Sequence, residues 1–172
     1  GLEILHGVEV DIMPDGSLDF DDDTLARFDI VLASLHDAGG QEGARLTERY
    51  LQAMRHPLVN VITHPANRSP AMSHGYDLDF DRLFEAAVET GTAMEIDGSP
   101  SHLDMDGRVA RRAAAAGVTI VINSDCHRAE ALGRQMSFGV GTARRGWIAP
   151  DQVLNTRGIA GVRDFIARKR GR

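Results

Sequence analysis

Four apolar, strand-like stretches of the sequence end in a carboxylate or an imidazole. Their ends read GVEVD, SLHD, ITHP and NSDCH, and the side chains that could carry chemistry there are Glu9, His36, His64, Asp125 and His127. Neutral imidazole and carboxylate together suit zinc, manganese or iron. If these groups converge at one edge of a sheet, they can hold a multinuclear cluster that activates water and binds the oxygens of a phosphoester.

The residues alone support the Asp-x-His pair as metal ligands more strongly than they support the single histidines. A lone histidine after a strand is more often a hydrogen-bonded structural residue, so His36 and His64 gain weight only because several strand ends coincide. Asp125 and His127 form the strongest pair, because period two directs both side chains to the same side of an extended chain.

The carboxylates leave alternatives open. Glu9 lies within its strand, and Asp11 is equally well oriented. Glu95 and Asp97 end another apolar run and are similar candidates, although a carboxylate there can equally cap the turn that follows. The residues alone therefore do not select one carboxylate in these strands.

Apolar runs alternate with helical patterns along the chain. Strands are expected at residues 4–12, 29–35, 58–63, 92–96 and 118–123, with a weaker strand at 138–141. Helices are expected at residues 21–28, 43–55, 79–90, 106–116 and 159–170, with a short one from Ala129. This order predicts an α/β fold with parallel strands. Periodicity does not separate a barrel from an open sheet, but chemistry at many strand ends is typical of barrels.

Size and composition are those of a globular protein. The 172 residues are 42% hydrophobic and 26% charged, and we expect one domain over residues 1–172. The longest apolar runs are strand-sized, far below the roughly 20 residues that cross a bilayer, so no membrane association is expected. The single cysteine, Cys126, excludes an internal disulfide framework, and no signal-like segment opens the chain. A cytoplasmic protein is therefore expected.

The net charge of −6 argues against a general basic clamp for nucleic acid, because such affinity comes from neutralising phosphates with Lys and Arg. Any contact with DNA must be local. A basic helical C-terminus is more often a solvated end that suits the helix dipole than a binding surface. The candidate cations near this end are Arg144, Arg145, Arg163, Arg168, Lys169, Arg170 and Arg172.

Longer blocks of the sequence resemble a known family. The blocks GVEVDIMPDGSLDFDDDTLARFDIVLASLH, VITHP, ETGTAMEI, VTIVINSDCH, FGVGTARRGW and VLNTRG span most of the chain. They resemble the polymerase-and-histidinol-phosphatase (PHP) family, and within it the C-terminal PHP domain of bacterial and archaeal family X DNA polymerases. The resemblance implies a distorted, TIM-like (β/α)7 barrel with up to three divalent ions, manganese or zinc and possibly iron. It also implies that their ligands include Glu9, His36, His64, Asp125 and His127.

The chain departs from the family pattern at its start. The family's barrel begins with a strand that ends in His-x-His, followed by an Asp and a further His, and this chain contains no such motif. The resemblance therefore implies an incomplete barrel, with the first strands and the polymerase domains upstream of Gly1. A sheet edge is then open unless another segment covers it. Glu9 is preferred to Asp11 on the resemblance alone, and Arg68 is a candidate for binding a substrate phosphate.

Three functions follow as hypotheses. The first is a metal-dependent phosphoesterase that trims DNA 3′ ends as an exonuclease, as part of a family X DNA polymerase in DNA repair, with Asp125 and His127 as catalytic residues. The second is a small-molecule phosphatase of the histidinol phosphatase type. The third is a degenerate, non-catalytic PHP scaffold module. Without the upstream ligands, the chain by itself could be inactive.

Overall fold

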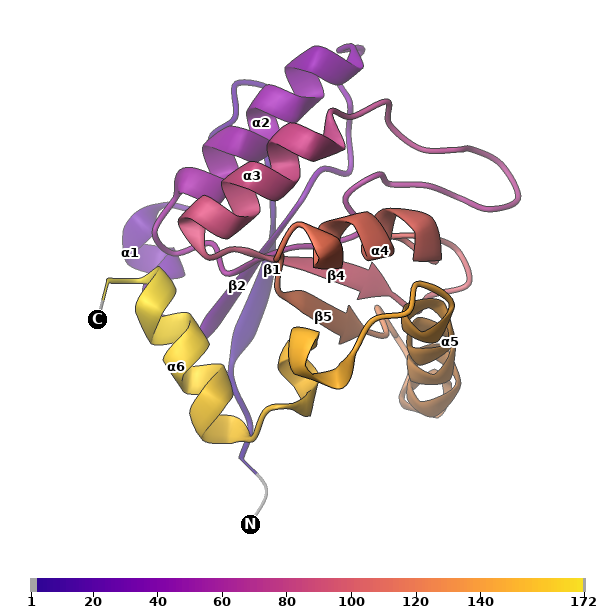
Figure 1. The fold of residues 1–172 in the computed structure, drawn as a ribbon. Coiled ribbons are helices and arrows are strands. Elements are labelled where there is room, and N and C mark those ends of the chain that lie inside the picture. The colour runs from indigo at the N-terminus through magenta and orange to yellow at the C-terminus, as the bar shows by residue number, and fades with distance from the viewer. Residues whose placement is uncertain (1–2, 172) are drawn as a thin grey trace.

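The computed structural model describes residues 3–171, so Gly1, Leu2 and Arg172 lie outside the described residues. Five parallel strands form one sheet whose order follows the sequence (Figure 1). The strands are β1 (Gly7–Asp11), β2 (Ile30–Ser34), β3 (Val61–Ile62), β4 (Ala93–Asp97) and β5 (Ile120–Asn123). The prediction of an α/β fold with parallel strands is thereby confirmed.

Six α-helices occur in the described part of the chain, together with three short 3-10 helices. They are α1 (Asp22–Leu25), α2 (Gly43–Arg55), α3 (Phe80–Thr90), α4 (Gly107–Ala115), α5 (Leu132–Arg145), α6 (Ile159–Lys169), η1 (Ala129–Ala131), η2 (Pro150–Gln152) and η3 (Leu154–Thr156). No helix within residues 3–171 has the length and apolar character needed to span a bilayer.

The strand order is that of a barrel segment rather than of a doubly wound sheet, in which the order reverses at a switch point. Within the described residues, β1 and β5 each pair with one neighbouring strand, so the sheet ends at both. The free edge of β5 is covered by the chain itself. The side chain of Asn155 accepts a hydrogen bond from Ile122 N at 2.7 Å and donates one to Ile122 O at 2.8 Å.

Local chemistry explains where the helices begin and end. Asp79 and Asp106 precede α3 and α4. The Asp79 carboxylate accepts one backbone N–H of the first turn, and the Asp106 carboxylate accepts two. Gly91 ends α3 in the left-handed conformation, at φ 68°. Helix α2 ends before His56, which is extended because the residue before Pro57 is disfavoured in the helical region.

The outer face of the sheet carries the larger apolar core. Side chains from α2, α3, α4 and α5 pack there against alternate residues of the strands, among them Val31, Ile62, Met94 and Ile120. Helices α2 and α3 lie side by side over this face (Figure 1). Full burial of one such side chain stabilises the fold by about 1.5–3 kcal/mol.

The inner face of the sheet is apolar near the start of the strands and polar near their ends. The apolar half packs against α6 and η3. Its core residues are Val61, Ala93, Val121, Leu154, Phe165 and Ile166, with Ile30, Leu32 and Val162 packed against them. The other half of the same face carries the carboxylates and imidazoles singled out in the sequence.

The strand predicted at residues 138–141 is wrong, because these residues lie in α5. Gly139 is buried there, and a Cβ on it would lie 2.6 Å from Cγ2 of Ile122. The glycine therefore lets α5 approach β5 closely. Packing against the sheet overrides the β-prone character of the sequence FGVG, since strand propensity depends on context.

Candidate metal centre

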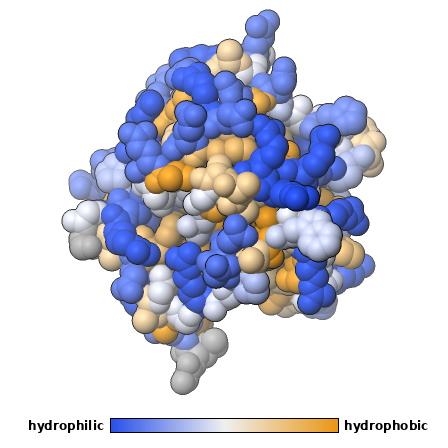
Figure 2. All heavy atoms as spheres, viewed as in Figure 1, coloured by the Kyte–Doolittle hydropathy of each residue, from blue (hydrophilic) through white to orange (hydrophobic). Residues whose placement is uncertain are grey.

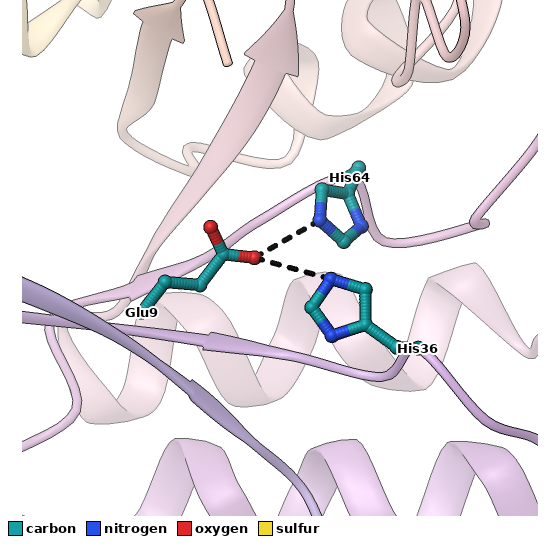
Figure 3. Close-up of side chains that lie close together, drawn as sticks. All are labelled: Glu9, His36 and His64. Carbon is teal, nitrogen blue, oxygen red and sulfur yellow. Dashed lines mark hydrogen bonds and ion pairs between the residues drawn. The ribbon is translucent and has the colours of Figure 1, made fainter. Parts of the chain in front are cut away.

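Three ligand-type side chains meet at the ends of β1, β2 and β3. Oε1 of Glu9 lies 3.1 Å from Nε2 of His64 and 3.5 Å from Nε2 of His36. The Glu9 carboxylate points toward both imidazole rings (Figure 3). The ligand atoms of the three residues lie within 4.8 Å of one another, so one cation could contact all three.

Neighbouring side chains orient this first group. Oδ1 of Asp11 lies 2.5 Å from Nδ1 of His36, which favours a proton on Nδ1 and leaves Nε2 free to face Glu9. Thr63 Oγ1 donates a hydrogen bond to Glu9 Oε1 at 3.2 Å. A carboxylate behind a histidine is a recurring feature of metal sites, because it sets the tautomer and raises the basicity of the ligand nitrogen.

A second group forms at the ends of β4 and β5. The ligand atoms of Asp97, His102 and Asp125 lie within 4.8 Å of one another. The His102 ring stacks on His64, with ring centroids 5.0 Å apart and 17° between the planes. The two groups therefore adjoin and place six ligand-type side chains along one edge of the sheet.

Two carboxyl groups at this edge are buried, those of Glu95 and of Asp97 in the second group. Glu95 is 2% exposed and accepts hydrogen bonds from Asn123 Nδ2 at 2.6 Å and from His64 N at 2.8 Å. Burial raises the pKa of Glu95 to about 8. Burial also raises the pKa of Asp97 to about 7, and the nearby charge of Asp125 acts in the same direction.

Glu9 and His64 behave as an ion pair. The hydrogen bond with His64 lowers the pKa of Glu9 to about 2. Burial lowers the pKa of His64, but the hydrogen bond to Glu9 and the charge of Glu95 outweigh it and raise that pKa to about 9. The edge thus holds protons at neutral pH among closely spaced acids. A divalent cation would release such protons on binding, since its ligands must be deprotonated.

Two buried polar atoms fit a cation at this edge. Within the described residues, Nδ1 of His64 and Oδ2 of Asp97 are buried and have no hydrogen-bond partner. Buried polar atoms are normally paired, and such exceptions can mark the place of an ion. His64 and Asp125 also have positive φ angles of 23° and 45°, a costly backbone conformation that clusters at ligand sites.

An open cavity of about 430 Å³ adjoins both groups. Glu9, His64, Glu95 and Asp125 contribute to its lining, together with Met136 of α5. These ligand-type side chains therefore face a cavity that is open to solvent.

Comparisons with known proteins agree with this geometry, although no family model matches the chain. The DNA polymerase/3′-5′ exonuclease PolX of Bacillus subtilis is 42% identical over 165 residues, which are 96% of this chain and 29% of that protein. A probable phosphatase of Thermoanaerobacter sp. strain X514 is 32% identical over 180 residues, 99% of this chain and 70% of that protein. This chain belongs to a PHP-like family. Within the family, a probable phosphatase of Shewanella oneidensis is 35% identical over 142 residues, 77% of this chain and 54% of that protein.

Within this PHP-like chain, the five predicted ligands fall in different places. Glu9, His36 and His64 form the first group, and Asp125 belongs to the second. His127 lies outside both groups: its side chain is 86% exposed, and its Nδ1 is 3.1 Å from the backbone oxygen of Asp125. The geometry brings four of the five together, and the roles of all five as ligands stay predictions.

Sequence reasoning did not select Asp97 and His102. The cap expected of Asp97 is present, because its Oδ1 accepts a hydrogen bond from Ser99 N at 2.6 Å. Its other oxygen has no partner within residues 3–171 and is available to a cation. The sequence signal for Asp97 was its position at the end of the apolar run that forms β4. His102 had no such signal, since only the folded loop places its ring on His64.

Arg68 lies beside the centre rather than in either group. Its Nη1 donates a hydrogen bond to Leu103 O at 3.3 Å and lies 3.7 Å from a carboxylate oxygen of Asp106. Its backbone oxygen lies 3.1 Å from Nδ1 of His102. Arg68 therefore connects the second group with a neighbouring cavity.

Proposed function

We propose that this chain is the C-terminal portion of a divalent-metal-dependent phosphoesterase domain over residues 1–172. The observation that carries the proposal is the pair of adjoining ligand groups, each with its atoms within 4.8 Å, at the ends of successive parallel strands. Imidazole and carboxylate without thiolate suit manganese or zinc, and possibly iron. The family resemblance favours up to three such ions in the intact domain and a barrel completed by upstream strands.

The finer proposal is that the domain trims DNA 3′ ends as a 3′-5′ exonuclease in DNA repair, within a longer family X DNA polymerase. Its support is the 42% identity to a protein named polymerase and exonuclease, of which the chain spans only 29%. The remainder of such a protein would supply the upstream strands and the polymerase domains. We also propose that this enzyme acts in the cytoplasm without contact with a membrane.

Each residue has a role in the proposed site. Glu9, His36 and His64 would hold one ion, and Asp97, His102 and Asp125 would hold another, with His127 joining when its exposed ring turns inward. Bound divalent ions supply a nucleophile at neutral pH and neutralise charge on the phosphoryl oxygens. Asp11 keeps His36 in the required tautomer. Arg68, Asp125 and His127 stay candidates for contact with the substrate.

Replacement of Asp125 tests the proposal directly. We expect Asp125→Ala, made in the intact protein that includes the upstream strands, to abolish hydrolysis of a phosphoester while the far-ultraviolet circular dichroism and the melting temperature stay near those of the wild type. Asp23→Ala, at an exposed acidic residue of α1, is the control and keeps full activity. Full activity of Asp125→Ala would defeat the assignment.

Metal analysis separates the enzyme from a degenerate scaffold module. We expect the purified chain, dialysed against excess Mn²⁺ or Zn²⁺, to retain metal in stoichiometric amount, and His64→Ala to lose at least one ion per chain. A wild-type chain that rejects both metals would favour the scaffold instead.

The relatives named probable phosphatases favour a second candidate, a phosphatase for a small phosphomonoester. A labelled oligonucleotide and histidinol phosphate, assayed side by side with the same enzyme preparation, distinguish the two. Faster turnover of histidinol phosphate would replace the exonuclease proposal and leave the phosphoesterase proposal standing.

A further inference from the structure

A second cavity, of about 460 Å³, lies at the opposite end of the strands from the metal centre. Gly91 and Thr119, just before β4 and β5, contribute to its lining, as do the last turns of α3 and α6 (Figure 1). We call this space the lysine cavity. The charged residues that line it are Glu89, Arg157, Arg168 and Lys169.

Lys169 has an unusual environment for a lysine. Of the 19 lysine and arginine residues in the chain, it is the one lysine. Its side chain is half-buried, and its Nζ donates a hydrogen bond to Met54 O, in α2, at 2.5 Å. Within residues 3–171 no carboxylate forms an ion pair with this amine. Burial of a charge without an opposite charge beside it is unfavourable, so this environment favours the neutral amine.

The neutral amine of Lys169 is a nucleophile. Burial lowers its pKa to about 8. About a tenth of the amine is then neutral at pH 7, whereas an ordinary lysine is almost entirely charged. The neutral form keeps an N–H for Met54 O and has a lone pair that can attack an electrophile. Lysines activated by burial act as nucleophiles in this way.

Two arginines of the same cavity can bind an anion. Arg157 follows η3 and is half-buried, whereas Arg168 directly precedes Lys169 in α6 and is exposed. In the part of the chain that the structure describes, neither forms an ion pair or a side-chain hydrogen bond. Figure 2 shows hydrophilic side chains over this end of α6, which solutes can therefore reach. Arginine binds phosphate with two parallel hydrogen bonds, which makes phosphate the expected anion.

The combination of groups defines the class of ligand. A nucleophilic amine requires an electrophilic carbon, and the two arginines require a phosphate near that carbon. An acyl phosphate has both, because its carbonyl carbon is bonded directly to the phosphate oxygen. Glu89 is the one acidic residue of the lining, so three cations outnumber it and the cavity suits such an anion.

We propose that Lys169 is an acylation site that takes its acyl group from an acyl phosphate, whose phosphate binds to Arg157 and Arg168. The amine nitrogen attacks the carbonyl carbon and a carbon–nitrogen bond forms. The bond from that carbon to the phosphate oxygen breaks, and inorganic phosphate leaves with the electron pair. By way of water, the phosphate receives the proton that the nitrogen loses. The resulting amide keeps one N–H for Met54 O, and the site is independent of the proposed phosphoesterase.

Peptide mass spectrometry after exposure to acetyl phosphate tests the site. The experiment uses the intact protein with its upstream strands, carrying Arg45→Lys as a reference amine. Arg45 is exposed, lies at the opposite end of α2 from Met54 and does not line the lysine cavity. In the peptide that begins at Asp164, we expect acetylation of Lys169 at least about tenfold faster than that of the reference amine, because more of its amine is neutral. Equal or slower acetylation of Lys169 would overturn the proposal.

Competition by inorganic phosphate tests whether the cavity recognises the phosphate of the donor. In the same protein, we expect excess inorganic phosphate to slow the acetylation of Lys169 about tenfold by occupying the arginines, and to leave the reference amine unchanged. Both amines are exposed to the same acetyl phosphate, so any hydrolysis of the donor cancels in the ratio of their rates. An unchanged ratio would overturn the proposal.

A donor without phosphate separates the role of the arginines from simple access to the amine. Arg157→Gln/Arg168→Gln should slow acetylation of Lys169 by acetyl phosphate about tenfold, but acetylation by N-hydroxysuccinimidyl acetate less than about twofold. The matched control Arg134→Gln/Arg144→Gln, at exposed positions of α5 outside the cavity, should leave both rates unchanged. Equal slowing with the two donors would overturn the proposal. If the double variant fails to fold, the phosphate competition still decides.

Discussion

The two halves of the inner face of the sheet are built from the same strands but have opposite character. Val61 in the apolar half and Thr63 in the polar half are separated by one residue, as are Ala93 and Glu95. Helix α6 covers the apolar half, whereas the polar half gathers two ligand groups around an open cavity. The environment therefore changes within about 7 Å along a strand, the distance spanned by two residues.

This difference shows how one sheet separates stability from chemistry. The apolar half removes hydrocarbon from water and stabilises the fold. The polar half buries carboxyl groups with raised pKa values, including Glu95 and Asp97, which is unfavourable for folding but suits cation binding. Substitutions in the apolar half should therefore lower the stability of the fold. Substitution of a buried carboxyl group in the polar half should instead lower the affinity for metal without lowering the stability.

The largest effect is expected from Phe165→Ala in α6. Phe165 is 5% exposed in the apolar half, and its truncation should lower the free energy of unfolding by about 3–4 kcal/mol. Urea denaturation measures the loss. Phe138→Ala, at a residue of α5 that is 40% exposed, should lower it by less than about 1 kcal/mol. Similar losses for both variants would show that α6 does not stabilise the sheet.

Asp97→Asn, in the polar half, should lower the affinity for metal and leave the stability of the fold intact. We expect metal affinity to fall about a hundredfold, equivalent to about 2.7 kcal/mol, because a ligand oxygen is lost. Without metal, the variant should be at least as stable as the wild type, since the negative charge of a buried carboxylate is removed. Chelator competition and thermal melts in EDTA measure the two quantities. A marked loss of metal-free stability would assign Asp97 a structural role.

Asn155→Ala tests how the edge of β5 is covered, next to the place where the apolar half gives way to the polar half. Its side chain makes two hydrogen bonds with the backbone of Ile122, at 2.7 and 2.8 Å, along the free edge of β5. Loss of both should lower the free energy of unfolding by about 2 kcal/mol. Hydrogen exchange should become faster at Ile122 N, while Val31 N, bonded to Asn60 at 3.0 Å, keeps its protection. Unchanged exchange at Ile122 would contradict the edge-covering role.

The smallest effect concerns Lys169, near the end of α6. Burial lowers its pKa to about 8, while its Nζ donates a hydrogen bond to Met54 O at 2.5 Å. Because the folded-state pKa lies below the ordinary lysine value of 10.5, the destabilisation by the charged form is fully present below pH 8 and disappears as the pH rises toward 10.5. Lys169→Met should thus be more stable than the wild type at pH 7, by about 1 kcal/mol after allowance for partial exposure.

Urea denaturation between pH 7 and pH 10 checks this linkage. The stability difference between Lys169→Met and the wild type should shrink as the pH rises. Arg168→Met, at an exposed neighbour, should differ from the wild type by a constant amount, since arginine keeps its charge over this range. A constant difference for Lys169→Met as well would show that its burial has no effect on the pH dependence.

Most of the elements could be predicted from local sequence. The helix expected at residues 43–55 has those bounds, because the apolar spacing and Pro57 determine its extent. The strand expected at residues 58–63 is reduced to Val61–Ile62, since strand bounds depend on pairing with neighbours. The strand predicted at residues 138–141 failed for a related reason: a glycine contact with β5 decides in favour of the helix.

The candidate site could be predicted in part. Residues near the ends of parallel strands or just after them lie close to the same edge of the sheet. Glu9, His36 and His64 could therefore be expected near one another, and their ligand atoms do lie close together. The choice of Glu9 over Asp11 came from family resemblance alone. In the fold both contact His36, Glu9 at Nε2 and Asp11 at Nδ1, which separates a candidate ligand from the residue that orients it.

The sequence by itself determined the alternation of strands and helices, the edge of the sheet at which the ligand-type side chains lie, and the types of those side chains. Only the tertiary structure decided that His102 stacks on His64, that His127 stays exposed and that Lys169 lines a cavity with two arginines. The physical reason is that the periodicity of apolar residues reflects only local structure, between residues that are near one another in the chain. The direction of a loop side chain and the approach of two helices depend on contacts between residues far apart in sequence.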